Sequence, residues 1–324
     1  MNETIVILVN REVLAGSYKT AIADQKNSVA LLANGLLPIF TSKLNIVIMH
    51  GNKPQVGYVL FRSELASHIL HHIPLDVCGA DTQGATGYML SQSISNVLHQ
   101  SNRKREVMPI VTQTIISSEK KYYEEKNKQI GPWLDHGKAE QRRQIYGWSI
   151  VEEPGYGYRR VVASPPPVGI VEIECVKQLV QSGSIVITAG GGGVPVIVNE
   201  KGLLEGVEAV VDTDGVACML AHQLEAKVLL MIVEDDSKFI SSGFRINDYL
   251  HMSCKELDKI LKGNTISSNM VMRKLDSAKD YLQRGGSQVV ITTLEKLPST
   301  LMKESGLWIS DQNPTVDLSE IMSI

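Results

Sequence analysis

Short runs of β-branched and aliphatic residues recur along the chain, and a segment that favours a helix follows most of them. The first run, residues 4–9 (TIVILV), is typical of a strand that is buried on both faces. Similar runs occupy residues 45–49, 107–112, 184–188, 227–233 and 288–292. We expect residues 288–292 to form the last central strand of the sheet. The helical segments are residues 18–37, 55–72, 81–100, 172–181, 215–225 and 268–284. This alternation predicts an α/β fold, a three-layer αβα sandwich whose central sheet is mainly parallel.

The alternation breaks between residues 117 and 167. A charged run covers residues 119–128, and a polar segment at 138–144 favours a helix. Residues 148–152 and 158–163 flank a turn at Pro154-Gly155, which predicts a β-hairpin that pairs the two segments. Because this insertion is short and weakly apolar, we expect a protruding flap over a site rather than a separate domain.

Composition excludes several classes of protein. The chain has 324 residues, of which 43% are hydrophobic and 21% charged, so it is not disordered. Its formal charge of −3 gives no global basic field for nucleic acid or an anionic membrane. The longest uncharged stretch, residues 183–199, is interrupted by glycines and a proline, so we expect no membrane span. Four widely spaced cysteines and the absence of a signal-peptide pattern favour reduced thiols and a cytoplasmic protein.

Four consecutive glycines form the strongest local signal. Gly190, Gly191, Gly192 and Gly193 follow the expected strand at residues 184–188. Glycines let a backbone approach a ligand closely and direct N–H groups at an anion. The alternative is a flexible loop. The run matches neither a P-loop nor a GxGxxG dinucleotide turn, which disfavours those nucleotide folds.

Two further segments stand at places where ligands bind in α/β proteins. The segment His50-Gly51-Asn52-Lys53 comes directly after a buried strand, where it could offer N–H groups to an anion or form a plain turn. Asp212-Thr213-Asp214 precedes an expected helix. Its carboxylates could order a cationic side chain or lie near a nucleotide-bound Mg²⁺, although N-capping by Asp214 is the simpler interpretation. Lys128 and Lys274, taken singly, would be surface residues.

Taken together and in this order, these segments resemble the carbamate kinase family of the amino-acid kinase fold. The resemblance is collinear over nearly the whole chain. Its motifs are HGNKPQVG (50–57), DTQGATGYM (81–89), VTQ (111–113), KNKQIGP (126–132), GYGYRRVVASPPP (155–167), GGGGVPV (190–196) and GVEAVVDTD (206–214).

The resemblance implies reversible phosphoryl transfer between ATP and carbamate, giving carbamoyl phosphate and ADP with Mg²⁺, in a cytoplasmic homodimer. Residues 1–205 would form the acceptor lobe with the flap 117–167, and residues 206–324 the nucleotide lobe. The resemblance implies catalytic roles for Lys128, Asp214 and Lys274. It implies substrate-binding roles for Gly51, Asn52, Lys53, Gly190, Gly191 and Gly192, and nucleotide-binding roles for Asp212, Asp214, Asp236 and Lys274. It assigns no metal ligand on the protein.

The chain departs from the family pattern where phosphate would bind. The family usually has a glycine pair after the first strand, where this chain has Asn10-Arg11-Glu12. Lys53 and Met272 each stand where the family has a glycine, and Thr213 stands where it has a charge-stabilising lysine. Two hypotheses about the function follow. The chain is an active carbamate kinase, or a relative that acts on another small acid, with Arg11 or Lys53 replacing a lost cation. Alternatively, it is a catalytically impaired member that serves as a binding, regulatory or complex-forming subunit.

Overall fold

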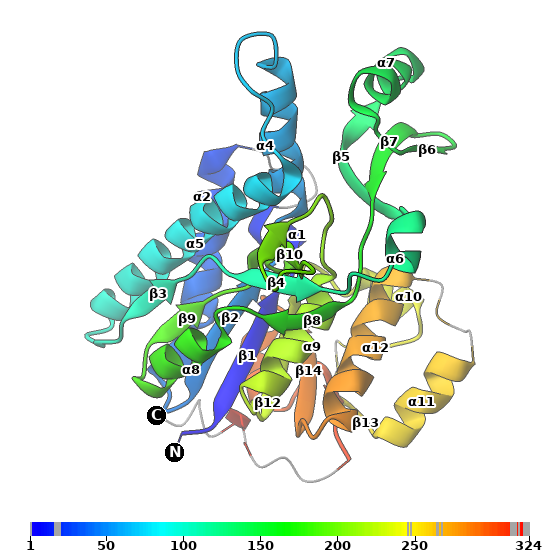
Figure 1. The fold of residues 1–324 in the computed structure, drawn as a ribbon. Coiled ribbons are helices and arrows are strands. Elements are labelled where there is room, and N and C mark those ends of the chain that lie inside the picture. Colours follow the sequence, from blue (N-terminus) through cyan, green and yellow to red (C-terminus); the bar gives the residue numbers. More distant parts are fainter. Residues whose placement is uncertain are drawn as a thin grey trace.

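The fold is a three-layer αβα sandwich around an eight-stranded sheet, as the sequence predicts (Figure 1). The structure is a computed structural model that describes residues 2–15, 21–244, 246, 248–263, 266, 268–311, 316, 318 and 319, without the side chains of Ala15, Lys53 and Pro54. The strand order is β13-β15-β14-β12-β1-β2-β9-β3, and all paired strands are parallel except β14 and β15. The strands are β1 (Thr4–Val9), β2 (Asn45–His50), β3 (Val107–Pro109), β9 (Ile185–Ile187), β12 (Val228–Val233), β13 (Leu250–Met252), β14 (Gln288–Thr293) and β15 (Leu307–Ile309).

The apolar runs bury both of their faces because successive side chains of a strand point to opposite sides. In β1, Val6 and Leu8 join one core cluster, while Ile5, Ile7 and Val9 join the other. The helices that contribute buried residues to the first cluster include α8 (Ile173–Gln181), α9 (Thr213–Gln223), α10 (Ser237–Ser241), α11 (Cys254–Lys262) and α12 (Asn269–Gln283). Those that contribute to the second cluster include α1 (Arg11–Ala15), α2 (Ile22–Gly35), α3 (Leu37–Thr41), α5 (Leu75–Gln100) and α13 (Leu297–Leu301).

The predicted strand at residues 107–112 is wrong in its second half. β3 ends at Pro109, and the chain passes into β4 (Gln113–Ile116) of a second sheet. The amide side chain of Gln83 explains the break, since it binds both the N–H and the carbonyl of Thr112, at 3.2 Å and 3.1 Å. Thr112 is therefore tied to α5, and its carbonyl also accepts from the N–H of Val194, which begins a strand of the second sheet, at 2.9 Å. The second sheet has the order β11-β10-β4-β8. Its other strands are β8 (Pro167–Ile170), β10 (Val194–Val198) and β11 (Leu204–Gly206).

Several predicted boundaries are also wrong. The helix expected at residues 55–72 is α4 (Lys53–Leu65), which ends seven residues early, and the helix expected from residue 81 begins at Leu75. The expected helix at 18–37 is divided between α2 and α3, and its residues 18–20 lie outside the described part of the chain. β14 is not the last central strand, because β15 follows it. The short α10 (Ser237–Ser241) follows β12.

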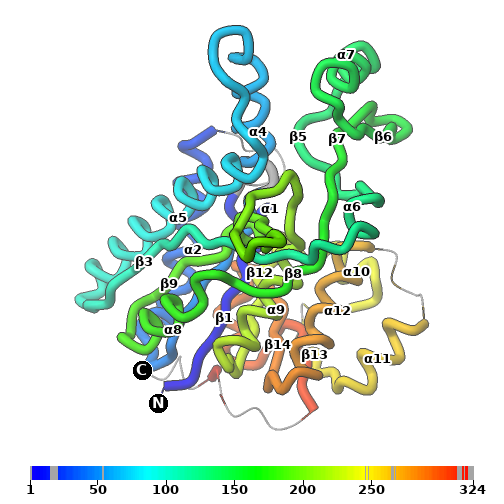
Figure 2. The backbone as a smooth tube through the Cα atoms, in the orientation of Figure 1, coloured from blue at the N-terminus to red at the C-terminus, as the bar shows by residue number. Residues whose placement is uncertain are grey.

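The insertion at residues 117–167 forms the predicted flap, which protrudes beside α4 (Figures 1 and 2). Its three-stranded sheet has the order β5-β7-β6 and contains β5 (Lys128–Leu134), β6 (Ile150–Glu153) and β7 (Gly157–Val162). The predicted hairpin is confirmed, since β6 and β7 pair antiparallel. The flap also carries α6 (Lys121–Glu124) and α7 (His136–Tyr146). Within the described residues, none of the helices combines the length and apolar character needed to cross a membrane.

Candidate active site

The candidate site lies where the carboxyl ends of β1 and β2 meet the start of α9. Ligands of open α/β sheets bind beyond these strand ends. A cavity of about 140 Å³ opens there, lined among others by Asn10, Arg11, Gly51, Asp212, Thr213 and Asp214. The structure thus brings together three segments that are about 40 and 160 residues apart in the sequence.

Two lysine–aspartate pairs flank Thr213. Nζ of Lys128, at the start of the flap strand β5, lies 2.7 Å from Oδ1 of Asp212. Nζ of Lys274, on α12, lies 2.8 Å from Oδ1 of Asp214. The side chain of Lys274 is 1% exposed and that of Lys128 is 14% exposed, so the interpretation of either as a surface residue is wrong. Each aspartate therefore holds one lysine, from a different part of the fold, beside the cavity.

Asp212, rather than Asp214, caps α9. The backbone N–H of Gly215 donates to Oδ2 of Asp212 at 3.3 Å, while Asp214 lies in the first turn and points its carboxylate to Lys274. The N-cap predicted at Asp214 is therefore wrong by two residues. The other expectation for this segment, that its carboxylates order cationic side chains, is confirmed.

The glycine loop packs tightly against the end of β2. Residues Gly190–Gly192 form a 3₁₀ turn, η1, and Gly191 has a φ of +68°. A Cβ atom at Gly190 would lie 2.5 Å from the imidazole of His50, and one at Gly191 would lie 1.9 Å from Oδ1 of Asn52. The glycines are thus required by close packing as well as by backbone conformation. Two of the loop's N–H groups, those of Gly192 and Gly193, donate within the turn.

The side chains at the end of β2 are buried and held in place. Asn52 is 4% exposed, and its Nδ2 donates to Oγ1 of Thr82 at 2.7 Å. His50 is 1% exposed, and burial lowers its pKa to about 4, with a weak opposing effect from the Gly51 carbonyl. His50 is therefore neutral at pH 7 and supports the glycine loop as an uncharged ring. The side chain of Lys53 lies outside the described part of the structure.

Arg11 occupies the turn after β1, where the family has glycine. A Cβ atom at Gly51 would lie 2.8 Å from Cβ and 2.9 Å from the backbone N of Arg11, so this turn approaches Gly51 closely. The guanidinium pairs with Glu12, and Arg11 is 41% exposed at the cavity. Oε2 of Glu12 is buried and has no hydrogen-bond partner among the described residues. This corner of the site therefore carries a cation and a carboxylate in place of bare backbone.

Sequence reasoning missed two further cations. Lys238 and Arg273 also line the cavity. Both had an available signal, because Lys238 closely follows the end of a buried strand and Arg273 is adjacent to Lys274. Asp236, a predicted nucleotide ligand, forms an ion pair with Lys296. Met272 packs against the core. With Arg11 and the two paired lysines, cations outnumber carboxylates around the cavity, an arrangement suited to a multiply charged anion.

Comparison with known proteins agrees with the fold. The model of the amino acid kinase family matches residues 20–293. A carbamate kinase of Pyrococcus horikoshii is 34% identical over 315 residues, which cover 96% of this chain and all of the relative. The carbamate kinase-like protein YahI of Escherichia coli K12 is 33% identical over 314 residues, covering 95% of this chain and 99% of that protein. The structure of a carbamate kinase from Giardia lamblia bound to AMP-PNP superposes with a TM-score of 0.86 at 26% identity, covering 96% of this chain and 99% of that one.

The chain therefore belongs to the amino acid kinase family, whose model matches most of its length. Its fold is that of a kinase of this family. Within the family it belongs to the carbamate kinase group, because carbamate kinases match it over nearly their full lengths.

Proposed function

We propose that the chain is a phosphotransferase that moves a phosphoryl group reversibly between ATP and carbamate, giving carbamoyl phosphate and ADP. The observation that carries the proposal is the pair of ion pairs Lys128–Asp212 and Lys274–Asp214 beside one cavity. Phosphoryl transfer needs little covalent chemistry from the protein. It depends on positioning and on neutralising charge. Two oriented lysines that approach from the flap and from α12 supply both.

Each aspartate orients a lysine without taking part in the transfer. Asp214 holds the buried ammonium of Lys274 on the α12 side, where we place the nucleotide phosphates. Asp212 holds Lys128, which reaches the transferring group from the flap. Gly51 and the glycine loop shape the acceptor end, since side chains there would collide with Arg11, His50 and Asn52. Because these groups are already oriented, little reorganisation is needed when charge develops in the transition state.

The proposal includes MgATP as the nucleotide substrate. The described residues contain no cluster of three or more His, Cys, Asp or Glu that could hold a metal ion. Asp212 and Asp214 are each committed to a lysine. Mg²⁺ therefore belongs to the nucleotide complex in this account, where it neutralises phosphate charge. The AMP-PNP complex of the Giardia lamblia relative supports nucleotide binding by this fold.

The proposal also covers organisation. We assign residues 1–205, with the flap 117–167, to the acceptor and residues 206–324 to the nucleotide. We assign the chain to a cytoplasmic homodimer, on the resemblance to the family.

A specific observation favours a second function, that of a nucleotide-binding subunit with impaired turnover. Arg11 and Glu12 stand where the family has glycines, and Glu12 brings a negative charge to a site for anions. Thr213, between the two aspartates, replaces a lysine. Loss of one charge-stabilising donor typically lowers a rate by about 10²–10³. These changes affect catalysis more than nucleotide binding.

The test measures ATP formation from ADP and carbamoyl phosphate, together with MgATP binding by calorimetry. Turnover with nucleotide binding supports the phosphotransferase. Nucleotide binding without turnover supports the impaired subunit. If the well-folded protein neither binds MgATP nor forms ATP, both functions are wrong.

A further inference from the structure

The flap contacts the body of the protein at two places, and one arginine lies between them. On one side β5 packs along α4, so closely that a Cβ atom at Gly57 would lie 2.9 Å from Cα of Gly131. On the other side the end of β7 joins the segment 207–211 that leads to Asp212. The N–H of Val210 donates to the carbonyl of Ala163 at 3.1 Å. Arg160 of β7 faces both contacts.

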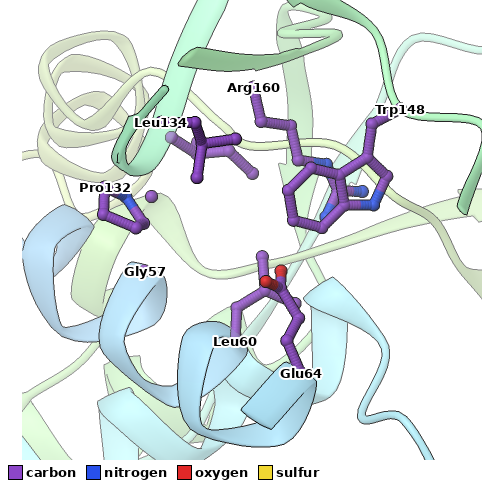
Figure 3. Close-up of a pocket in the computed structure, with 9 residues that line it drawn as sticks. Gly57, Leu60, Glu64, Pro132, Leu134, Trp148 and Arg160 are labelled. Carbon is purple, nitrogen blue, oxygen red and sulfur yellow. The ribbon is translucent and has the colours of Figure 1, made fainter. Parts of the chain in front are cut away.

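The guanidinium of Arg160 is buried, and one of its nitrogens is paired with a carboxylate. Its side chain is 5% exposed, Nη2 donates to Oε2 of Glu208 at 3.1 Å, and its charge lies 4.3 Å from the ring centroid of Trp148. Nη1 is buried without a partner among the described protein atoms. Figure 3 shows Arg160 and Trp148 on one side of a small cavity and Glu64 of α4 on the other. The cavity, about 10 Å³, has room for about one water molecule, which could satisfy Nη1.

Glu64 strengthens the first of these contacts, because it ties the flap to α4. Its Oε2 accepts from Nε of Arg142, on α7, at 3.0 Å, and the two side chains are 5% and 13% exposed. The Arg142 guanidinium lies 5.8 Å from the ring centroid of Trp148. The indole is therefore flanked by two arginines that pair with carboxylates outside the flap. Breaking the Arg142–Glu64 pair, in which both side chains are largely buried, costs far more than breaking a pair at the surface.

The register of the flap sheet links this arrangement to the site. In β5 and β7, Ile130 pairs with Arg160 and Lys128 pairs with Val162. Lys128 is thus two residues from the partner of Arg160. Glu208, which Arg160 binds, is four residues before Asp212, which Lys128 binds. The two ion pairs therefore both join the flap sheet, one from β5 and one from β7, to the segment 208–212.

We propose that Arg160 is a positioning residue, which, through Glu208 and Trp148, holds the flap in the one position where Lys128 meets Asp212. Arg160 does not contact the cavity of the site, and it acts through Lys128. The inference rests on the proposed function only for its catalytic consequence. The placement of Lys128 is a property of the folded protein and is measurable without turnover.

The test compares Arg160→Met with the matched variant Arg143→Met. Arg143 binds Glu140 and the carbonyl of Ile150, all within the flap, so it bridges nothing to the body. The first readout is competitive acylation of lysines by a dilute N-hydroxysuccinimide ester, with the labelling of Lys128 measured by mass spectrometry relative to exposed Lys126. We expect Arg160→Met to raise this ratio about tenfold, which corresponds to a loss of about 1.4 kcal/mol in the free energy that favours the closed flap. Arg143→Met should leave it within about twofold of the wild type, less than about 0.5 kcal/mol on the same scale.

The second readout is kinetic. Arg160→Met should lower kcat by about 10- to 100-fold, as expected when a reacting group is misplaced, and leave the KM for nucleotide unchanged. Arg160→Lys should recover part of kcat, because it restores the charge. If Arg160→Met does not fold, Glu208→Gln replaces it, since that carboxylate is 57% exposed and its loss is tolerable. Labelling ratios for Arg160→Met, or for Glu208→Gln in its place, that equal those of Arg143→Met overturn the proposal. Altered labelling in a protein without turnover would count against the phosphotransferase and not against the positioning role.

Discussion

The Lys274–Asp214 pair gives the sharpest prediction about stability. Lys274 is 1% exposed and Asp214 13% exposed, with 2.8 Å between Nζ and Oδ1. At an effective dielectric constant of about 20, the Coulomb attraction at this distance is about 6 kcal/mol, much of it offset by dehydration of the two groups. Removing one partner of a buried pair costs about 3–5 kcal/mol. Asp214→Asn leaves an acceptor for the ammonium, so we expect a loss near the lower end, about 3 kcal/mol.

Urea unfolding, followed by circular dichroism without nucleotide, measures this loss. The control is Glu174→Gln, which breaks the exposed pair between Glu174 and Lys177 at 2.7 Å. It should cost no more than about 0.5 kcal/mol. Adding Lys274→Met to Asp214→Asn should restore stability, because the stranded ammonium is removed. Equal effects of Asp214→Asn and Glu174→Gln, or no recovery in the double variant, would refute the reasoning.

Three further predictions concern the site. Because burial lowers the pKa of His50 to about 4, the unfolded chain binds a proton more readily below pH 6.5, and stability falls as the pH drops from 6.5 to 4. Between pH 7 and 4.5, the free energy of unfolding should fall by about 2 kcal/mol less in His50→Gln than in the wild type. Parallel profiles of the free energy of unfolding against pH would contradict this. Gly147 has a similar φ of +66° to that of Gly191 but lies in open space, so Gly147→Ala should cost about 1–2 kcal/mol of stability. Gly191→Ala should destabilise the protein far more, because its Cβ would collide with Asn52. Equal urea midpoints for the two variants would exclude this collision as the cause. Thr213→Lys should raise ATP formation at least about tenfold, and an unchanged rate would show that other cations fill this role.

The fold was predictable because its signals are local. Continuous apolar runs such as residues 4–9 specify strands that are buried on both faces, and the turn at Pro154-Gly155 specifies the flap hairpin. The break in the strand at 107–112 was not predictable, since it depends on Gln83 binding Thr112 across 29 residues. β13 and β15 have three residues each, too few to show a period.

The contacts within the candidate site were not predictable from the sequence. Resemblance to a family indicated Lys128, Asp212, Asp214 and Lys274 one by one. The sequence separations in the pairs, 84 and 60 residues, carry no local signal, so only the folded chain shows which lysine meets which aspartate. The role of Arg160 was hidden for the same reason, because it lies in a strand where an arginine is expected to face solvent.

In the proposed function, a lysine of the flap that Asp212 orients acts in phosphoryl transfer. The most direct measurement is the initial rate of ATP formation from ADP and carbamoyl phosphate for Lys128→Ala and for Lys126→Ala, an exposed lysine two residues away in the same flap. Because Lys128 is proposed to neutralise charge on the transferring group, we expect Lys128→Ala to lower kcat by about 10²–10³. Lys126→Ala should leave kcat unchanged. Equal rates for the two variants in a protein that turns over would contradict this role of Lys128.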